Sequence, residues 1–206
     1  EATLLRWCKA LPDDVMRCRP VLSVTYASAL LSTGEGAGVE ERLQDAEHWL
    51  AQVPPGAMPA NGLPAGMVVR DYEEFCRLPG EIAVYRAGQA LMVGNLAVTL
   101  AHAQHALDLL DAHDLVWRGA ASAILGLAAW SSGELAGAYQ SYAAGMGRLQ
   151  KAGNIADAIA GTVTLADIRL AQGQLRDAMH LYEQSLQLAA NQDPPVLRGT
   201  ADMHVG

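Results

Sequence analysis

Apolar residues recur along most of the chain at the three- and four-residue spacing of amphipathic α-helices, separated by short polar or glycine-containing turns. From residue 79 onward this pattern predicts helices at 79–93, 96–110, 115–131, 135–151, 154–171 and 175–190. Upstream it predicts one or two short helices within 1–19 and further helices at 20–33 and 39–51. Asp114 and Asn154 precede two of the runs and are expected to be N-caps.

Three of the predicted turns carry the same Gly-x-Leu motif, at 94–96, 133–135 and 173–175, with spacings of 39 and 40 residues. The residue seven before each turn glycine is small, the residue three before is large and apolar, and the residue five after is again small. With the residues before Gly34 included, these columns contain Ala27, Ala87, Gly126 and Ala166; Leu31, Leu91, Trp130 and Leu170; and Thr99, Ala138 and Ala178. Tyr142 and Tyr182 lie nine after their glycines.

This pattern is typical of tetratricopeptide (TPR) helix hairpins, lengthened from their usual period. We therefore predict an all-α fold, a right-handed α–α superhelix of helix hairpins with a period of 39–40 residues. A HEAT or armadillo array, which has a similar period, is the alternative.

Four segments follow from this reading. Residues 1–52 hold N-terminal helices and a first, degenerate repeat, and residues 53–78 hold a Pro/Gly-rich inserted loop and a short helix. Regular hairpins occupy 79–190, with Pro79 expected to open the first helix. Residues 191–206 are expected to begin a further repeat, because 196–201 resembles 116–121, so the chain resembles a truncated fragment.

Composition limits the classes of function. The net charge is −8 and the 14 basic residues form no run, which argues against direct nucleic-acid contact. Three cysteines without a CxxC pair are typical of reduced thiols, so we expect a cytoplasmic protein. We expect neither a signal peptide nor a membrane span. Without a phosphate-binding loop or hydrolase motif, we expect no enzyme activity, catalytic residue, metal or cofactor in these residues.

Candidate binding residues come from the first helix of each hairpin, which lines the concave face of a TPR array. The expected groove residues, for a ligand or a partner, are Leu91, Leu127, Trp130, Asp167 and Leu170. This face is almost wholly apolar. It either accepts an apolar helix or an uncharged ligand that stacks on Trp130, or fills itself by close packing of the superhelix.

Polar residues at packing positions raise further alternatives. Arg86 and Arg169 lie where apolar residues are expected and need partners, for which Glu81, Asp108 and Asp167 are candidates. They could be structural ion pairs or ligand contacts. The spacing of His102, His105 and Asp108 permits metal binding, but it is more typical of a solvated helix face.

Several segments together resemble the large ATP-dependent LuxR-type transcriptional regulators, also called MalT-like. The resemblance covers nearly the entire chain and rests on 4–12, 42–50, 78–87, 153–159, 165–173 and 197–202. It implies a helical-repeat region between an ATP-binding module and a DNA-binding helix-turn-helix, both outside these residues.

The resemblance implies that the segment senses a small inducer or binds a partner protein and couples binding to oligomerisation. Self-association of the chain is thus an open expectation. The alternative is a TPR interaction scaffold without a small-molecule ligand. The resemblance assigns no ligand contact to a numbered residue.

Overall fold

The computed structural model describes residues 2–53, 56 and 62–191, which form ten α-helices and no strand. The helices are α1 (Ala2–Ala10), α2 (Asp13–Arg17), α3 (Pro20–Ser32), α4 (Val39–Gln52), α5 (Tyr72–Met92), α6 (Leu96–Leu109), α7 (Leu115–Ser131), α8 (Leu135–Lys151), α9 (Ile155–Ala171) and α10 (Leu175–Ala190). The predicted all-α fold is confirmed. Apart from residue 191, the predicted further repeat lies outside the described residues.

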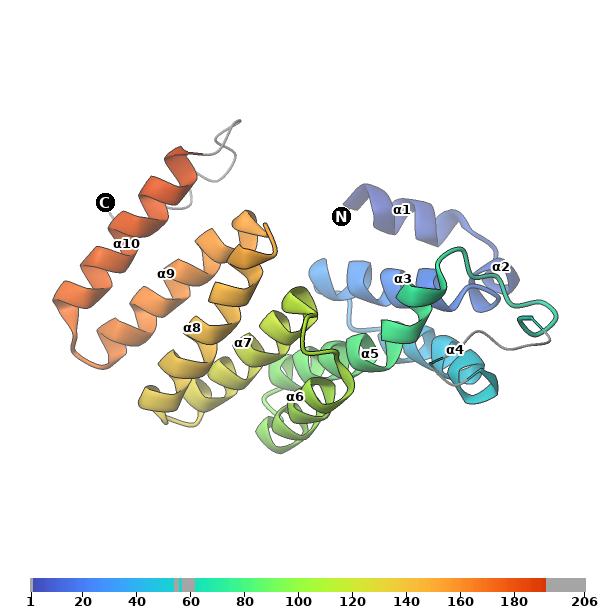
Figure 1. The fold of residues 1–206 in the computed structure, drawn as a ribbon, viewed down its shortest axis with the longest axis horizontal. Helices are drawn as coiled ribbons and strands as arrows, with labels where there is room; N and C mark the ends of the chain where they lie inside the picture. Colours follow the sequence, from blue (N-terminus) through green and yellow to red (C-terminus); the bar gives the residue numbers. More distant parts are fainter. Residues whose placement is uncertain (1, 54–55, 57–61, 192–206) are drawn as a thin grey trace.

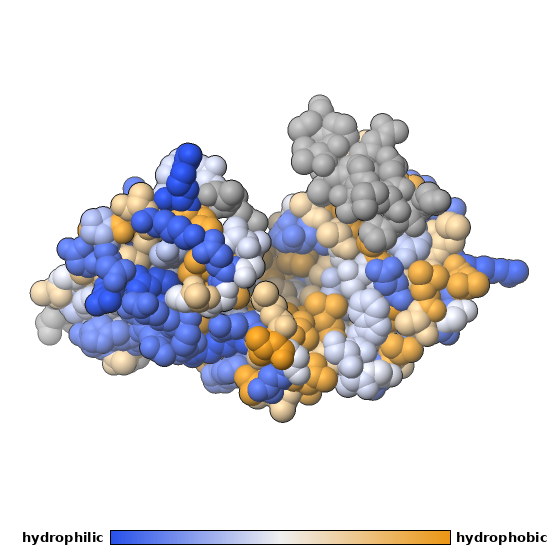
Figure 2. Space-filling model, turned by 180° about the vertical axis from the view of Figure 1, so that it is seen from behind, coloured by the Kyte–Doolittle hydropathy of each residue, from blue (hydrophilic) through white to orange (hydrophobic). Residues whose placement is uncertain are grey.

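The helices pack as hairpins α3–α4, α5–α6, α7–α8 and α9–α10, which stack side by side (Figure 1). Within the regular part, the second helix of a hairpin also packs on the first helix of the next, α6 on α7 and α8 on α9. The chain is therefore a TPR-like helical-repeat solenoid. Figure 2 shows its surface hollowed between the N-terminal helices and the C-terminal hairpin.

The junction between α4 and α5 differs from the later ones. The short connections 110–114 and 152–154 hold α6 on α7 and α8 on α9, whereas the connection from α4 to α5 spans 53–71. The backbones of α4 and α5 meet at few points, although α5 packs closely on α3 and α7. The long connection thus leaves α4 partly separated from the helix that follows it.

The turn glycines reverse the chain as predicted. Gly133 has a φ of 83°, a left-handed conformation that costs residues with a Cβ atom more than glycine. Its N–H donates to the Trp130 carbonyl at 2.9 Å, and the next N–H donates to Ala129 at 2.9 Å. Gly34, Gly94 and Gly173 share this conformation.

The small-residue columns allow the helices to approach closely. Ala87, Ala138, Ala166 and Ala178 are fully buried. At Gly126 a Cβ atom would lie 2.7 Å from the Tyr142 backbone nitrogen and 2.9 Å from the Ala138 carbonyl oxygen. The small residues that recur in the sequence therefore lie where two helices are in direct contact.

The prediction that Pro79 opens a helix is wrong. Pro79 lies inside α5, which begins at Tyr72. The Asp71 carboxylate caps this earlier start by accepting the N–H groups of Glu73 and Glu74 at 2.9 and 3.2 Å. Phe75 is fully buried and anchors the first turns, which offsets the hydrogen bond that proline removes.

One of the two predicted N-caps is confirmed. The Asp114 carboxylate accepts the N–H of Trp117 at 3.0 Å at the start of α7. Asn154 occupies the equivalent position before α9, but its side chain makes no capping hydrogen bond. Instead, its Nδ2 donates to the Asp157 carboxylate at 2.7 Å.

Candidate functional site

The five predicted groove residues lie on the first helices of three hairpins. Leu91 ends α5, Leu127 and Trp130 lie near the end of α7, and Asp167 and Leu170 lie near the end of α9. Leu170 is 42% exposed and the other four are half-buried.

Most of the predicted groove residues make contacts within the fold. Leu127 and Trp130 pack with Tyr139 and Leu181 against the core formed by α7, α8 and α9. The Asp167 carboxylate accepts the Tyr182 hydroxyl at 2.6 Å. These contacts favour a groove that is largely filled by its own side chains.

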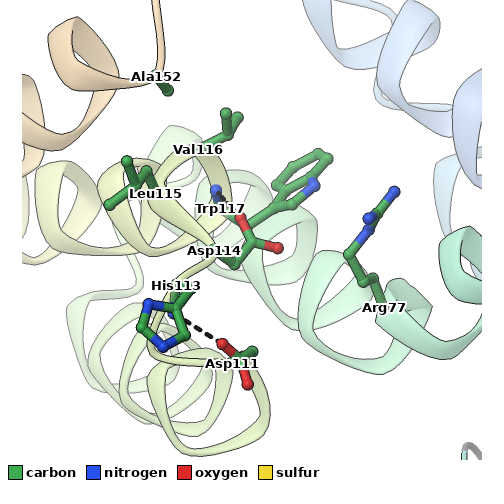
Figure 3. Close-up of a pocket in the computed structure, with 8 residues that line it drawn as sticks. All are labelled: Arg77, Asp111, His113, Asp114, Leu115, Val116, Trp117 and Ala152. Carbon is green, nitrogen blue, oxygen red and sulfur yellow. Dashed lines mark hydrogen bonds between the residues drawn. The ribbon is translucent and has the colours of Figure 1, made fainter.

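A different set of side chains lines a depression between α5 and α7 that is open to solvent. A hollow of about 580 Å³, here called the α5–α7 hollow, is drawn in Figure 3. Its lining residues are Arg77, Asp111, His113, Asp114, Leu115, Val116, Trp117 and Ala152. They come from α5, from the α6–α7 turn and the first residues of α7, and from the α8–α9 turn, so two successive hairpins and the turn that leads to the third contribute.

The turn between α6 and α7 is held in one conformation by local hydrogen bonds. The Asp111 carboxylate accepts the N–H of His113 at 2.7 Å, the dashed line in Figure 3, and Asp114 caps α7. The Arg118 guanidinium donates to the carbonyls of Leu107 and Leu110 at 2.7 and 3.0 Å. These bonds hold the backbone of the α6–α7 turn, which carries several of the side chains that line the hollow.

Trp117 is the aromatic group of the hollow. Its indole meets Tyr85 of α5 edge to face, with ring centroids 5.3 Å apart. It remains partly exposed, and in Figure 3 it lies between Arg77 and the Leu115–Val116 side.

The buried carboxyl of Glu81 lies beside this hollow and has an unusual pKa. Burial raises its pKa to about 7, because the carboxylate loses hydration. The positive charge of Arg77 and a hydrogen bond from Trp117 lower the pKa, and the negative charges of Glu74 and Asp114 raise it. The proton on Glu81 is therefore sensitive to the polar groups around the hollow.

The hollow combines an aromatic surface with a cation, two carboxylates and an imidazole. Such a set suits reversible binding of a small polar molecule. Over the described residues, no three His, Cys, Asp or Glu side chains gather in a way that could hold a metal ion.

The hollow could not be predicted from the repeat pattern. Val116 and Trp117 fit the repeat through their likeness to 196–197, so this pattern did not assign them to a site. A weak signal was present in the polar turn 111–114, which contains two aspartates and a histidine and ends three residues before Trp117.

The predicted partners of Arg86 and Arg169 are wrong, although Arg86 does form ion pairs. Arg86 donates to Glu40 at 2.7 Å and to Glu47 at 2.6 Å. Both glutamates lie on α4, and sequence spacing within α5–α10 could not reveal them.

Arg169 has no carboxylate among its recorded hydrogen-bond partners. Its guanidinium lies 3.4 Å from the centre of the Tyr139 ring and donates to Gln172 and Gln174 at 2.8 and 2.6 Å. Cation–π stacking and neutral amide oxygens thus replace the expected ion pair.

Comparison with known proteins identifies the repeats. Residues 80–206 match the family model described as the MalT-like TPR region. No curated protein matches the chain. Within its described part, no helix has the length and apolar character needed to cross a membrane.

Proposed function

The chain belongs to the family of MalT-like TPR regions, and from this premise we propose that it is the sensing segment of a LuxR-type ATP-dependent transcriptional regulator. A small inducer binds the α5–α7 hollow, and binding is coupled to oligomerisation. ATP is bound by a module outside these residues, and this segment makes no direct contact with DNA. The proposed location is the cytoplasm.

The observation that carries the proposal is the composition of the α5–α7 hollow. Its volume of about 580 Å³ falls within the range of roughly 300–1,000 Å³ typical of small-molecule sites. Trp117 offers an aromatic surface, while Arg77, Asp114 and His113 offer charges and hydrogen bonds at its edge.

The position of the hollow supports coupling to a change of shape. Its walls belong to the α5–α6 and α7–α8 hairpins and to the turn that leads to α9, and a solenoid is held together by contacts between neighbouring units. A ligand that touches both hairpins favours one spacing of these units, provided that it binds that arrangement more tightly than the others. The changed spacing alters the surfaces available for self-association.

The second candidate is a TPR scaffold that binds a partner protein without a small-molecule ligand. Leu91, Leu127, Trp130, Asp167 and Leu170 are the proposed contacts of this scaffold. The exposure of Leu170 favours it, whereas the internal contacts of Trp130 and Asp167 limit the free surface.

A thermal-shift screen of metabolites tests the proposal. An inducer present at a hundred times its Kd should stabilise the chain by about 2.7 kcal/mol. The double variant Arg77→Gln/His113→Gln, altered at exposed edge positions of the hollow, should bind at least tenfold more weakly. Arg176→Gln/His180→Gln makes the same changes at exposed positions of α10 and should bind as the wild type does.

Two results contradict the proposal. One is a broad metabolite screen without a saturable shift. The other is a ligand whose affinity is the same for the hollow variant and the α10 variant. The scaffold candidate would be supported if no metabolite bound and if a partner protein bound the wild-type chain but not Trp130→Ala, with the fold intact.

A further inference from the structure

The partly separated helix α4 leaves a second concave region, which we call the α4–α6 groove. Two hollows of about 350 and 470 Å³ share Arg86 and His102 and therefore adjoin. Helix α5 forms the floor, and α4 and α6 form the walls, as their order in Figure 1 allows. The lining residues are Glu40, Glu47, Leu50, Ala51, Pro79, Ile82, Ala83, Arg86, Gln89, Ala90, Val93, Asn95, Val98, His102, His105 and Leu109.

The α5 side of the groove combines small apolar residues with Arg86 and Gln89, and its α6 wall is mostly apolar. Ala83 and Ala90 on α5 are small and buried, so a docked chain could approach this helix closely. On the α6 side Val98 is 39% exposed and Leu109 is 46% exposed. Asp108 is the one acidic or basic residue of α6 other than its histidines, whereas α4 carries five such residues, α10 three and α8 two.

Figure 2 agrees with this contrast. Hydrophobic surface gathers at the lower middle of the view, over the central helices, next to the strongly hydrophilic surface of the N-terminal side. An apolar surface that adjoins a charged one is typical of an interaction site.

The charge of the groove indicates what kind of partner fits. Glu40 and Glu47 together carry two negative charges against the single positive charge of Arg86, and both glutamates remain nearly half exposed. Burial and the nearby guanidinium of Arg86 lower the pKa of His102, so this histidine adds no positive charge at neutral pH. The whole chain carries a net charge of −8.

We infer that the α4–α6 groove binds an amphipathic helix of a partner protein, with its apolar side facing α5 and α6 and its flanking lysines or arginines facing Glu40 and Glu47. Docking of a helix between two helices is a common mode of recognition. A second copy of this chain is a less suitable occupant, because two chains of −8 repel one another. The inference is independent of the proposed inducer site, since the groove and the α5–α7 hollow share no lining residue.

The test uses a synthetic, helix-stabilised peptide with leucines along one side and lysines on both flanks. A control peptide has glutamates in place of the lysines, and a second control has the same composition with the leucines dispersed around the helix. Fluorescence anisotropy measures binding to the wild-type chain. The lysine peptide should bind saturably and at least tenfold more tightly than either control, and its affinity should fall as salt rises.

Variants and a footprint locate the site. Val98→Ser/Leu109→Ser removes apolar contacts from the groove and should weaken binding at least tenfold. Leu175→Ser/Met179→Ser makes a matched change at exposed positions of α10 and should leave binding unchanged. Hydrogen exchange should slow in α4, α5 and α6 when the peptide is bound.

Three outcomes overturn the inference. They are equal binding of the lysine and glutamate peptides, unchanged binding in the Val98→Ser/Leu109→Ser variant, and protection that lies outside α4–α6. Sedimentation adds a fourth: a dimer of the chain that this variant dissociates, with no peptide binding, would make a second copy the occupant.

Discussion

Gly126 and Gly147 occupy helix interiors with opposite surroundings. A Cβ atom at Gly126 would lie 2.7 Å from both the nitrogen and the Cβ of Tyr142. At Gly147 no atom lies within 4 Å of the same position. The first glycine is required by close packing of α7 on α8, whereas the second only weakens the helix.

Substitution by alanine should therefore have opposite effects at these two residues. Gly126→Ala should lower the free energy of unfolding by about 1–3 kcal/mol, because the added methyl group forces α7 and α8 apart. Gly147→Ala should raise it by about 0.5–1 kcal/mol. Urea denaturation followed by circular dichroism measures both, and equal effects would contradict the packing argument.

Glu81 should make stability depend on pH. Its pKa rises from 4.5 in the unfolded chain to about 7 in the folded chain. Below about pH 4.5 both states hold the proton and burial carries no ionisation penalty. As pH rises from 4.5 toward 7, the unfolded state loses its proton before the folded state does, so the free energy of unfolding falls. Above pH 7 this loss stays at its full value of about 3 kcal/mol.

Glu81→Gln removes this penalty because the amide does not ionise. The variant should match the wild type at about pH 4 and exceed its free energy of unfolding by about 3 kcal/mol at about pH 8. Glu183→Gln, at an exposed carboxylate of α10, is the control and should show no such divergence. A constant difference between Glu81→Gln and wild type across this range would refute the pKa argument.

At the scale of single elements, side-chain capping bonds mark the starts of α5 and α7. The Asp114 and Asp71 carboxylates accept backbone N–H groups at the starts of α7 and α5, while Asn154 makes no such bond before α9. A proline inside α5 is tolerated because the cap and the buried first turns lie upstream of it. Side-chain caps thus mark some helix starts in this chain, while α9 begins close to its predicted position without one.

Asp114 and Asn154 precede α7 and α9 at equivalent positions, so their alanine variants compare the stability of a capped and an uncapped helix start. Asp114→Ala should lower the free energy of unfolding by about 0.5–2 kcal/mol, because it leaves an N–H at the start of α7 without its acceptor. Asn154→Ala removes only an exposed side-chain contact and should change it by less than about 0.5 kcal/mol. Thermal denaturation compares the two, and equal losses would show that the cap bond contributes nothing.

At the scale of the whole molecule, stability should vary along the solenoid. Helices α7 and α8 pack closely on each other and on both neighbouring hairpins, whereas α10 packs on α9. Because each unit is held by its neighbours, opening should begin where fewer helices are in contact.

Hydrogen exchange of the 206-residue chain measures this gradient. Amides of α7 and α8 should exchange more slowly than those of α10 by more than about tenfold. Uniform exchange across α7–α10 would instead indicate that these hairpins open as a single cooperative unit.

The regular half of the fold could be predicted closely because its signals are local. Turn glycines, small residues at fixed offsets and short connections specify α6–α10 to within a residue at each end. The start of α5 could not be predicted in this way, because Pro79 is a strong local signal that the Asp71 cap and the burial of Phe75 override. The proposed groove residues were placed on the expected helices, but their contacts depend on neighbours that the repeat pattern does not specify.

The hairpins could be predicted from the sequence, because a repeated pattern of small, large and turn residues acts over a few residues at a time, and the family could be predicted from the resemblance of several segments to its members. The pairing of Glu40 and Glu47 with Arg86, the common hollow of Trp117 and Arg77, and the separation of α4 from α5 became visible only in the folded chain. These features join residues from different hairpins, and their geometry depends on how each unit tilts against the next. Such tilts are set by packing across the interfaces, which no local pattern encodes.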